Sequence, residues 1–78
     1  MPRYYFDSRD GDSFICDEDG LEYPDLETAR EQATAALADL VKDVVPGSTR
    51  RELAIEVRDE HKEPLLRTSL VFETVRLR

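Results

Sequence analysis

The chain has 78 residues, 40% of them hydrophobic and 37% charged, and its net charge is −7. This length predicts one domain over residues 1–78, and the negative charge disfavours nucleic acid as a partner because phosphates would be repelled. No apolar run approaches the roughly 20 residues that cross a bilayer and no signal segment is evident, so we expect a cytoplasmic protein with no membrane partner.

The N-terminal segment predicts a β-hairpin. Residues 3–8 alternate in side-chain character and are rich in aromatics, which favours a strand. Asp10 and Gly11 then give a turn signal, and residues 13–16 are expected to form a second short strand. From residue 21 the chain is expected to run as an extended connector to Pro24, because the residue before a proline avoids helical geometry.

One amphipathic helix is predicted over about residues 26–44. Asp25 is a suitable N-cap, and Pro46 with Gly47 gives a stop signal. The apolar residues recur mostly three or four positions apart, which places them on one stripe. They are Leu26, Ala29, Ala33, Ala36, Leu37, Leu40, Val41 and Val44. Because the stripe begins with alanines, we expect close packing against a sheet there.

A second hairpin is predicted in the C-terminal half. Residues 52–58 alternate, with Leu53, Ile55 and Val57 toward the core, and a polar turn follows at 59–63. The last strand is expected over about residues 65–75, with one set of alternate side chains facing the core: Leu66, Thr68, Leu70 and Phe72.

These elements predict an α+β fold of the order β-β-α-β-β. Its four-stranded sheet would be wholly antiparallel with the strands in the order second, first, third, fourth. One helix would cover one face of the sheet and leave the other face open.

Acidic side chains cluster around the first hairpin and raise the question of a cation site. A calcium loop needs alternating oxygen ligands, a glycine at the sixth position and a carboxylate at the twelfth. Neither the register from Asp7 nor that from Asp10 provides them. The simplest interpretation is that Asp, Gly and Ser form turns here. Weak binding of a cation or another small ligand stays open for four carboxylates: Asp10, Asp12, Asp17 and Asp19.

No catalytic or cofactor-binding set is apparent. Cys16 is the only cysteine and His61 the only histidine, so neither a zinc site nor an internal disulfide is indicated. The three glycines are too far apart to form a phosphate-binding loop. We therefore expect no catalytic residue, no cofactor and no enzyme activity.

The open face of the sheet is the first place to look for an interface. Alternation places several apolar side chains on it: Tyr5, Ile15, Ala54, Leu65 and Val71. A contiguous patch of this kind favours a protein contact, most simply a twofold homodimer. An exposed edge strand pairing with its symmetry mate is another route. Residues 1–40 carry eleven acidic and three basic side chains, which favours a basic protein partner.

Five stretches of the chain carry a resemblance to a known family. They are 2–7 (PRYYFD) with 9–11 (RDG), 17–22 (DEDGLE), 24–27 (PDLE) with Ala29, 55–60 (IEVRDE), and 70–73 (LVFE). Through these motifs the chain resembles a family of short bacterial proteins, common in soil alphaproteobacteria, that is catalogued as a domain of unknown function. At the family's usual Asp-Gly turn this chain has His61 and Lys62. The resemblance implies a small cytoplasmic protein and brings no catalytic residue with it.

The hairpin, the helix start and the returning strand also look loosely like the partial ribonuclease-H-like domain of HicB-type antitoxins. This is an analogy of fold only, and the DNA-binding segment of those proteins is absent here. The leading hypothesis is a non-enzymatic, homodimeric protein-interaction module. The alternatives are an antitoxin-like regulator and a domain that binds a cation or small ligand weakly through its acidic hairpin ends.

Overall fold

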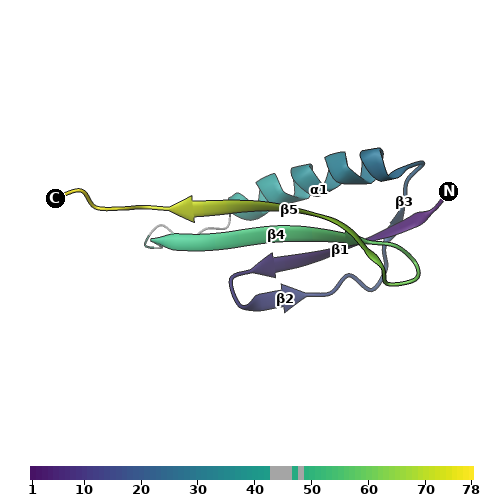
Figure 1. The fold of residues 1–78 in the computed structure, drawn as a ribbon, viewed down its shortest axis with the longest axis horizontal. Coiled ribbons are helices and arrows are strands. Elements are labelled where there is room, and N and C mark those ends of the chain that lie inside the picture. Colours follow the sequence, from purple (N-terminus) through teal and green to yellow (C-terminus); the bar gives the residue numbers. More distant parts are fainter. Residues whose placement is uncertain (43–46, 48) are drawn as a thin grey trace.

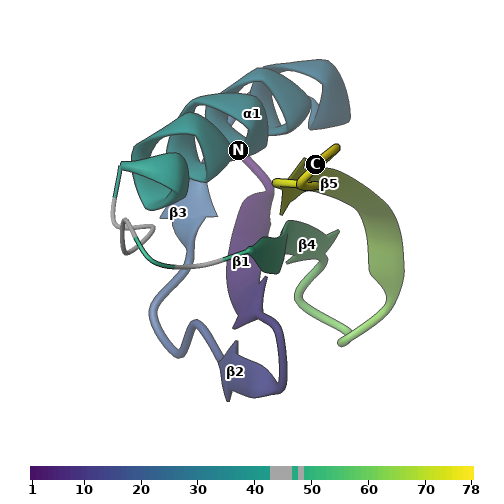
Figure 2. The same ribbon diagram turned by 90° about the vertical axis from the view of Figure 1, so that its left-hand side faces the viewer.

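The structure is a computed structural model that describes residues 1–42, 47 and 49–78. Its elements are β1 (Arg3–Asp10), β2 (Ser13–Ile15), β3 (Leu21–Glu22), α1 (Leu26–Val41), β4 (Arg50–Arg58) and β5 (Pro64–Glu73). All strand pairs are antiparallel, and α1 lies along one side of the sheet (Figure 1, Figure 2). The predicted α+β fold is confirmed.

The sheet runs in the order β2-β1-β4-β5, which is the order expected for the four predicted strands. β1 extends to Asp10, beyond the expected end at residue 8, because its last two residues pair with both β2 and β4. β3 is an additional short strand that pairs with Arg3 and Tyr4. The sequence indicated only an extended connector here, because two residues are too few to carry an alternating pattern.

The core lies between α1 and the middle of the sheet. Ala29, Ala33 and Leu37 of the helix are buried against one face of the sheet, where α1 contacts β4 and β5. The sheet contributes Tyr4, Leu53, Ile55 and Val57 to this cluster. Alanines at the contact allow the helix backbone to approach the sheet closely, as the sequence predicted.

The start of α1 is fixed by a side-chain cap. The Asp25 carboxylate accepts hydrogen bonds from the backbone N–H of Thr28 at 2.8 Å and from its hydroxyl at 2.7 Å, which satisfies a free donor of the first turn. The helix ends at Val41, with Lys42 as the C-cap. The remaining residues of the predicted helix, 43–44, and the stop signal at Pro46 lie outside the described residues.

The core prediction for the last strand is only half right. Leu66 and Thr68 are half-buried on the helix side of β5, but Leu70 is 44% and Phe72 39% exposed. The reason is visible in Figure 1, where the C-terminal end of β5 projects past the last turn of α1. Two large apolar side chains therefore stay accessible on a strand that was expected to bury them.

Candidate functional site

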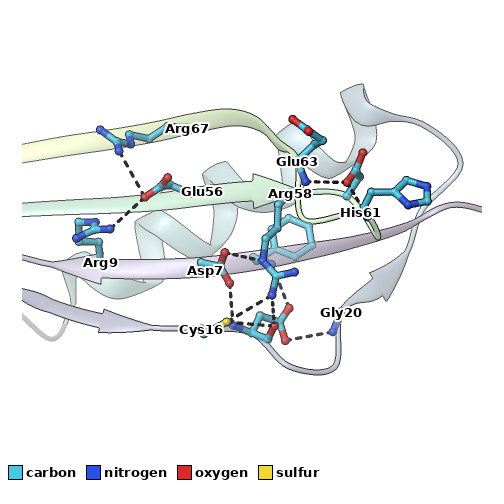
Figure 3. A network of polar contacts seen from close by, with 12 residues as sticks. Asp7, Arg9, Cys16, Gly20, Glu56, Arg58, His61, Glu63 and Arg67 are labelled. Carbon is cyan, nitrogen blue, oxygen red and sulfur yellow. Dashed lines mark hydrogen bonds and ion pairs between the residues drawn. The ribbon is translucent and has the colours of Figure 1, made fainter.

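An enclosed ion pair lies on the open face of the sheet. The register of β1 and β4 places Tyr5 opposite Arg58 and Asp7 opposite Glu56. Arg58 Nε donates to Asp7 Oδ2 at 2.8 Å, and Asp7 is only 7% exposed (Figure 3). The guanidinium also stacks on Tyr5, with Cζ 4.5 Å from the ring centroid. The Asp7 carboxylate raises the pKa of Arg58, because it stabilises the charged guanidinium by a direct hydrogen bond.

This ion pair holds the loop between β2 and β3 against the sheet. The second nitrogen of the Arg58 guanidinium, Nη2, donates to the backbone oxygen of Asp17 at 2.7 Å and lies 3.4 Å from Cys16 Sγ. Asp7 Oδ1 accepts the backbone N–H of Asp17 at 2.9 Å. Loop and strands are thus joined by charge-assisted hydrogen bonds, which are stronger than neutral ones.

The side chain of Asp17 completes the edge of β1. Its Oδ2 accepts the backbone N–H of Phe6 at 3.1 Å, in the gap of the ladder between β2 and β3. Its Oδ1 accepts the N–H groups of Asp19 and Gly20, both at 3.1 Å. Burial acts to raise the pKa of Asp17, but the three N–H donors and the nearby Arg58 charge together outweigh burial and lower that pKa below its usual value.

Gly20 is required by the same loop. Its φ of +69° lies in the left-handed region that favours glycine. A Cβ at this position would lie 2.9 Å from Tyr5 Cε2 and 3.0 Å from the carbonyl oxygen of Tyr4. The loop can therefore sit close to β1 only because residue 20 has no side chain.

A second set of charges continues along the open face. Glu56 of β4 pairs with Arg9 of β1 at 3.5 Å and with Arg67 of β5 at 3.4 Å (Figure 3). Arg9 also lies over Phe14, with Cζ 4.8 Å from its ring centroid. Charged side chains thus occupy the middle of the face that the sequence predicted to carry several apolar side chains.

The residues that the sequence placed on the open face differ in their surroundings. Tyr5 is half-covered by Arg58, and Ala54 is buried. Leu65 and Val71 are exposed on the edge strand β5.

The placement of Ile15 on the open face is wrong. Ile15 pairs with Ser8 and shares a small cavity with Leu40 of α1, so it lies on the helix side, and Phe14 takes the open-face position. Asp10 pairs with Ser13, so the hairpin loop has two residues. With a loop of this length, odd-numbered residues of β1 face the same side of the sheet as even-numbered residues of β2. The length of the loop therefore decides on which face Ile15 lies.

The acidic candidates are not brought together either. Asp10 is paired with Arg51, and the Asp17 carboxylate is used by backbone N–H groups. Asp12 and Asp19 are exposed. Among the residues that the structure describes, no group of three or more His, Cys, Asp or Glu side chains could hold a metal ion.

The remaining polar features have local roles. His61 lies in the turn before β5, where the Asp59 carboxylate accepts its backbone N–H at 2.8 Å and that of Glu63 at 3.0 Å. Cys16 is exposed beside Arg58.

A shallow cavity of about 330 Å³ opens between α1 and the β1–β3 edge, where Phe6 and Tyr23 meet edge to face. Apart from Asp17, its lining offers one acidic side chain, Asp39.

The outer edge of β5 is the other distinctive surface. In the described part of the chain, β5 pairs with β4 alone, so its second edge has no partner strand. The exposed apolar side chains of this strand point to both faces: Leu65, Leu70, Val71 and Phe72. Local sequence patterns indicate an exposed edge strand only in general terms, because the position of α1 decides which side chains of β5 stay exposed.

A family described as a domain of unknown function, DUF6894, matches residues 3–71. No curated protein and no solved structure matches the chain. In the described segments, no helix has the length and apolar character needed to cross a membrane.

Proposed function

The chain belongs to the DUF6894 family of domains of unknown function, and we propose that it acts as a protein-interaction module that docks through the outer edge of β5. The observation that carries the proposal is the chemistry of this edge. Thr68 to Phe72 contain no charge and no proline, and Leu70, Val71 and Phe72 are exposed there. An accessible strand of this composition is a template for pairing with another strand.

The two edges of the sheet differ in a way that supports this choice. At the opposite edge, β2 and β3 are only three and two residues long, and the Asp17 side chain occupies the gap between them. Short strands and covered N–H groups discourage edge pairing. β5 has ten residues and lacks such protection over its C-terminal half.

The polar network supports a binding role more than a catalytic one. Asp7 on the open face and Asp17 at the edge of β1 direct their oxygens to Arg58 and to backbone N–H groups. A catalytic carboxylate would need an oxygen free to reach a substrate. In this proposal the network has a structural role: it holds β1, β4 and the loop between β2 and β3 together as one unit beside β5.

Site-specific photo-cross-linking in the native cell tests this function. A benzophenone side chain replaces Val71 on the docking edge, and a matched variant carries it at Ala38, which is exposed on α1. The proposal predicts discrete protein adducts from position 71 and none from position 38. Absence of adducts at position 71, or equal adducts at both positions, would contradict it.

A further inference from the structure

We infer that the strand bound at the outer edge of β5 belongs to a second copy of this chain, paired antiparallel about a twofold axis at Leu70. The inference rests on the proposed docking function of β5 and adds the identity of the partner and the register. Three features of the described residues carry it: the direction of the free backbone groups, the charge pattern of β5, and the exposed side chains near its centre.

The first feature is the direction of the backbone groups. Thr74 donates its N–H to the carbonyl oxygen of Thr49 at 2.8 Å, one step beyond the paired residues Arg50 and Glu73. Backbone groups alternate in direction along an antiparallel ladder. Even-numbered residues of β5 therefore bond toward β4, and four odd-numbered residues present N–H and C=O groups outward: Arg67, Ser69, Val71 and Glu73.

The second feature is charge. Two antiparallel copies can exchange backbone hydrogen bonds only where outward residues meet outward residues. A twofold axis at Leu70 meets this condition and places Arg67 of each copy opposite Glu73 of the other. A twofold axis at Ser69 would place Arg67 of each copy opposite Val71 of the other. An axis at Arg67 would place the two Arg67 side chains opposite each other, which are like charges. Within β5, only the axis at Leu70 matches both charges.

The matched charges also extend rows that each chain already has. Glu73 lies opposite Arg50 and is bonded to it at 3.0 Å, and Arg67 lies opposite Glu56 at 3.4 Å. Across the dimer interface, four charged side chains would lie in one row on the open face: Arg50 and Glu73 of one copy, followed by Arg67 and Glu56 of the second copy. The signs alternate along the whole row, so each charge gains a second partner of opposite sign.

The third feature is the apolar content of the contact. The same axis places Leu70 beside Leu70 of the second copy and Phe72 beside Thr68. These side chains lie on the helix side, where Leu70 and Phe72 are exposed in the single chain. A twofold axis perpendicular to the sheet keeps both helices on one face. The strand order becomes β2-β1-β4-β5-β5-β4-β1-β2, which removes the free edge of β5.

Charge reversal tests the register. Arg67→Glu alone and Glu73→Arg alone are each expected to weaken dimerisation at least tenfold in sedimentation equilibrium, because both interface pairs become repulsive. The double variant R67E/E73R is expected to restore the dimer. In that variant the intrachain pairs with Glu56 and Arg50 stay broken, so recovery can come only from pairing between copies.

Disulfide trapping gives a second readout that does not depend on charge. With Cys16→Ser as background, Leu70→Cys places two thiols at a site without backbone hydrogen bonds, where opposed Cα atoms lie about 4.5 Å apart and can be bridged. Leu70→Cys is expected to cross-link at least tenfold faster than the matched variants Ser69→Cys and Val71→Cys. Equal rates, or no rescue by the double variant, would overturn the register.

The two proposals fail separately. A chain that stays monomeric at all concentrations but forms a discrete adduct with another protein from position 71 overturns the self-pairing and leaves the docking function intact. A chain without any adduct at position 71 overturns the docking function itself.

Discussion

Arg58 Nε reaches from β4 to within 2.8 Å of Asp7 Oδ2 on β1, and both side chains are largely enclosed. Asp7→Asn is expected to lower the free energy of unfolding by about 2 kcal/mol, because the Arg58 charge would lose its counter-ion in a mostly enclosed place. Urea denaturation measures this change. Glu27→Gln, which breaks an exposed ion pair with Arg30 on α1, is the matched control and should have little effect. Equal losses in the two variants would contradict a structural role of the Asp7–Arg58 pair.

Gly20 and Gly11 both have positive φ, of +69° and +58°, but they differ in their surroundings. Gly20→Ala is expected to cost about 2 kcal/mol or more, since its Cβ would meet Tyr5 and the Tyr4 carbonyl at 3.0 Å or less. Gly11→Ala should cost only about 1 kcal/mol, because nothing lies within 4 Å of its Cβ and only the backbone preference is lost. Denaturant midpoints of the two variants measure the difference. A Gly20→Ala variant no less stable than Gly11→Ala would show that the loop does not sit against β1 as described.

Asp17 predicts a specific dependence of stability on pH. Backbone N–H groups hold its folded-state pKa below the ordinary value of 3.8, even though burial acts in the opposite direction. A depressed folded-state pKa contributes stability that is present above the unfolded pKa and is lost as the pH falls through the folded pKa. The stability difference between the natural chain and Asp17→Asn should therefore be largest near neutral pH and shrink below pH 3.8. A difference that stays constant down to pH 3 would contradict this account of the loop.

Lys62 has a φ of 66°, a value that favours glycine. Lys62→Gly is expected to raise the free energy of unfolding by up to about 1 kcal/mol, because relief of the left-handed strain exceeds the added entropy of the unfolded chain. Thermal unfolding checks the sign. His61→Gly is the control at the neighbouring position, which has no positive φ, and it should lower the melting temperature.

Local patterns were enough to predict the main elements. The alternation of Leu53, Ile55 and Val57 and the capping chemistry of Asp25 act over a few residues, and both are found as expected. Hairpin connectivity then limited the sheet order to a form that agrees with the structure.

Other features depend on relations between distant segments, which local patterns do not contain. The orientation of Ile15 follows from the exact length of the hairpin loop. The exposure of Phe72 follows from where α1 ends relative to β5 (Figure 1). The Asp7–Arg58 pair joins two residues that lie 51 positions apart in sequence, so it depends on the register of β1 and β4. Such features decide where a binding surface can lie, so the docking edge emerges only from the folded chain.

Residue-resolved amide hydrogen exchange at two protein concentrations tests the self-pairing of β5 most directly. Arg67, Ser69, Val71 and Glu73 present their N–H groups outward, whereas Thr68, Leu70 and Phe72 bond toward β4. The account predicts that the even-numbered amides are protected at both concentrations and that the odd-numbered amides gain protection only in the concentrated sample. Odd-numbered amides that exchange equally fast in both samples, while the even-numbered ones stay protected, would contradict it.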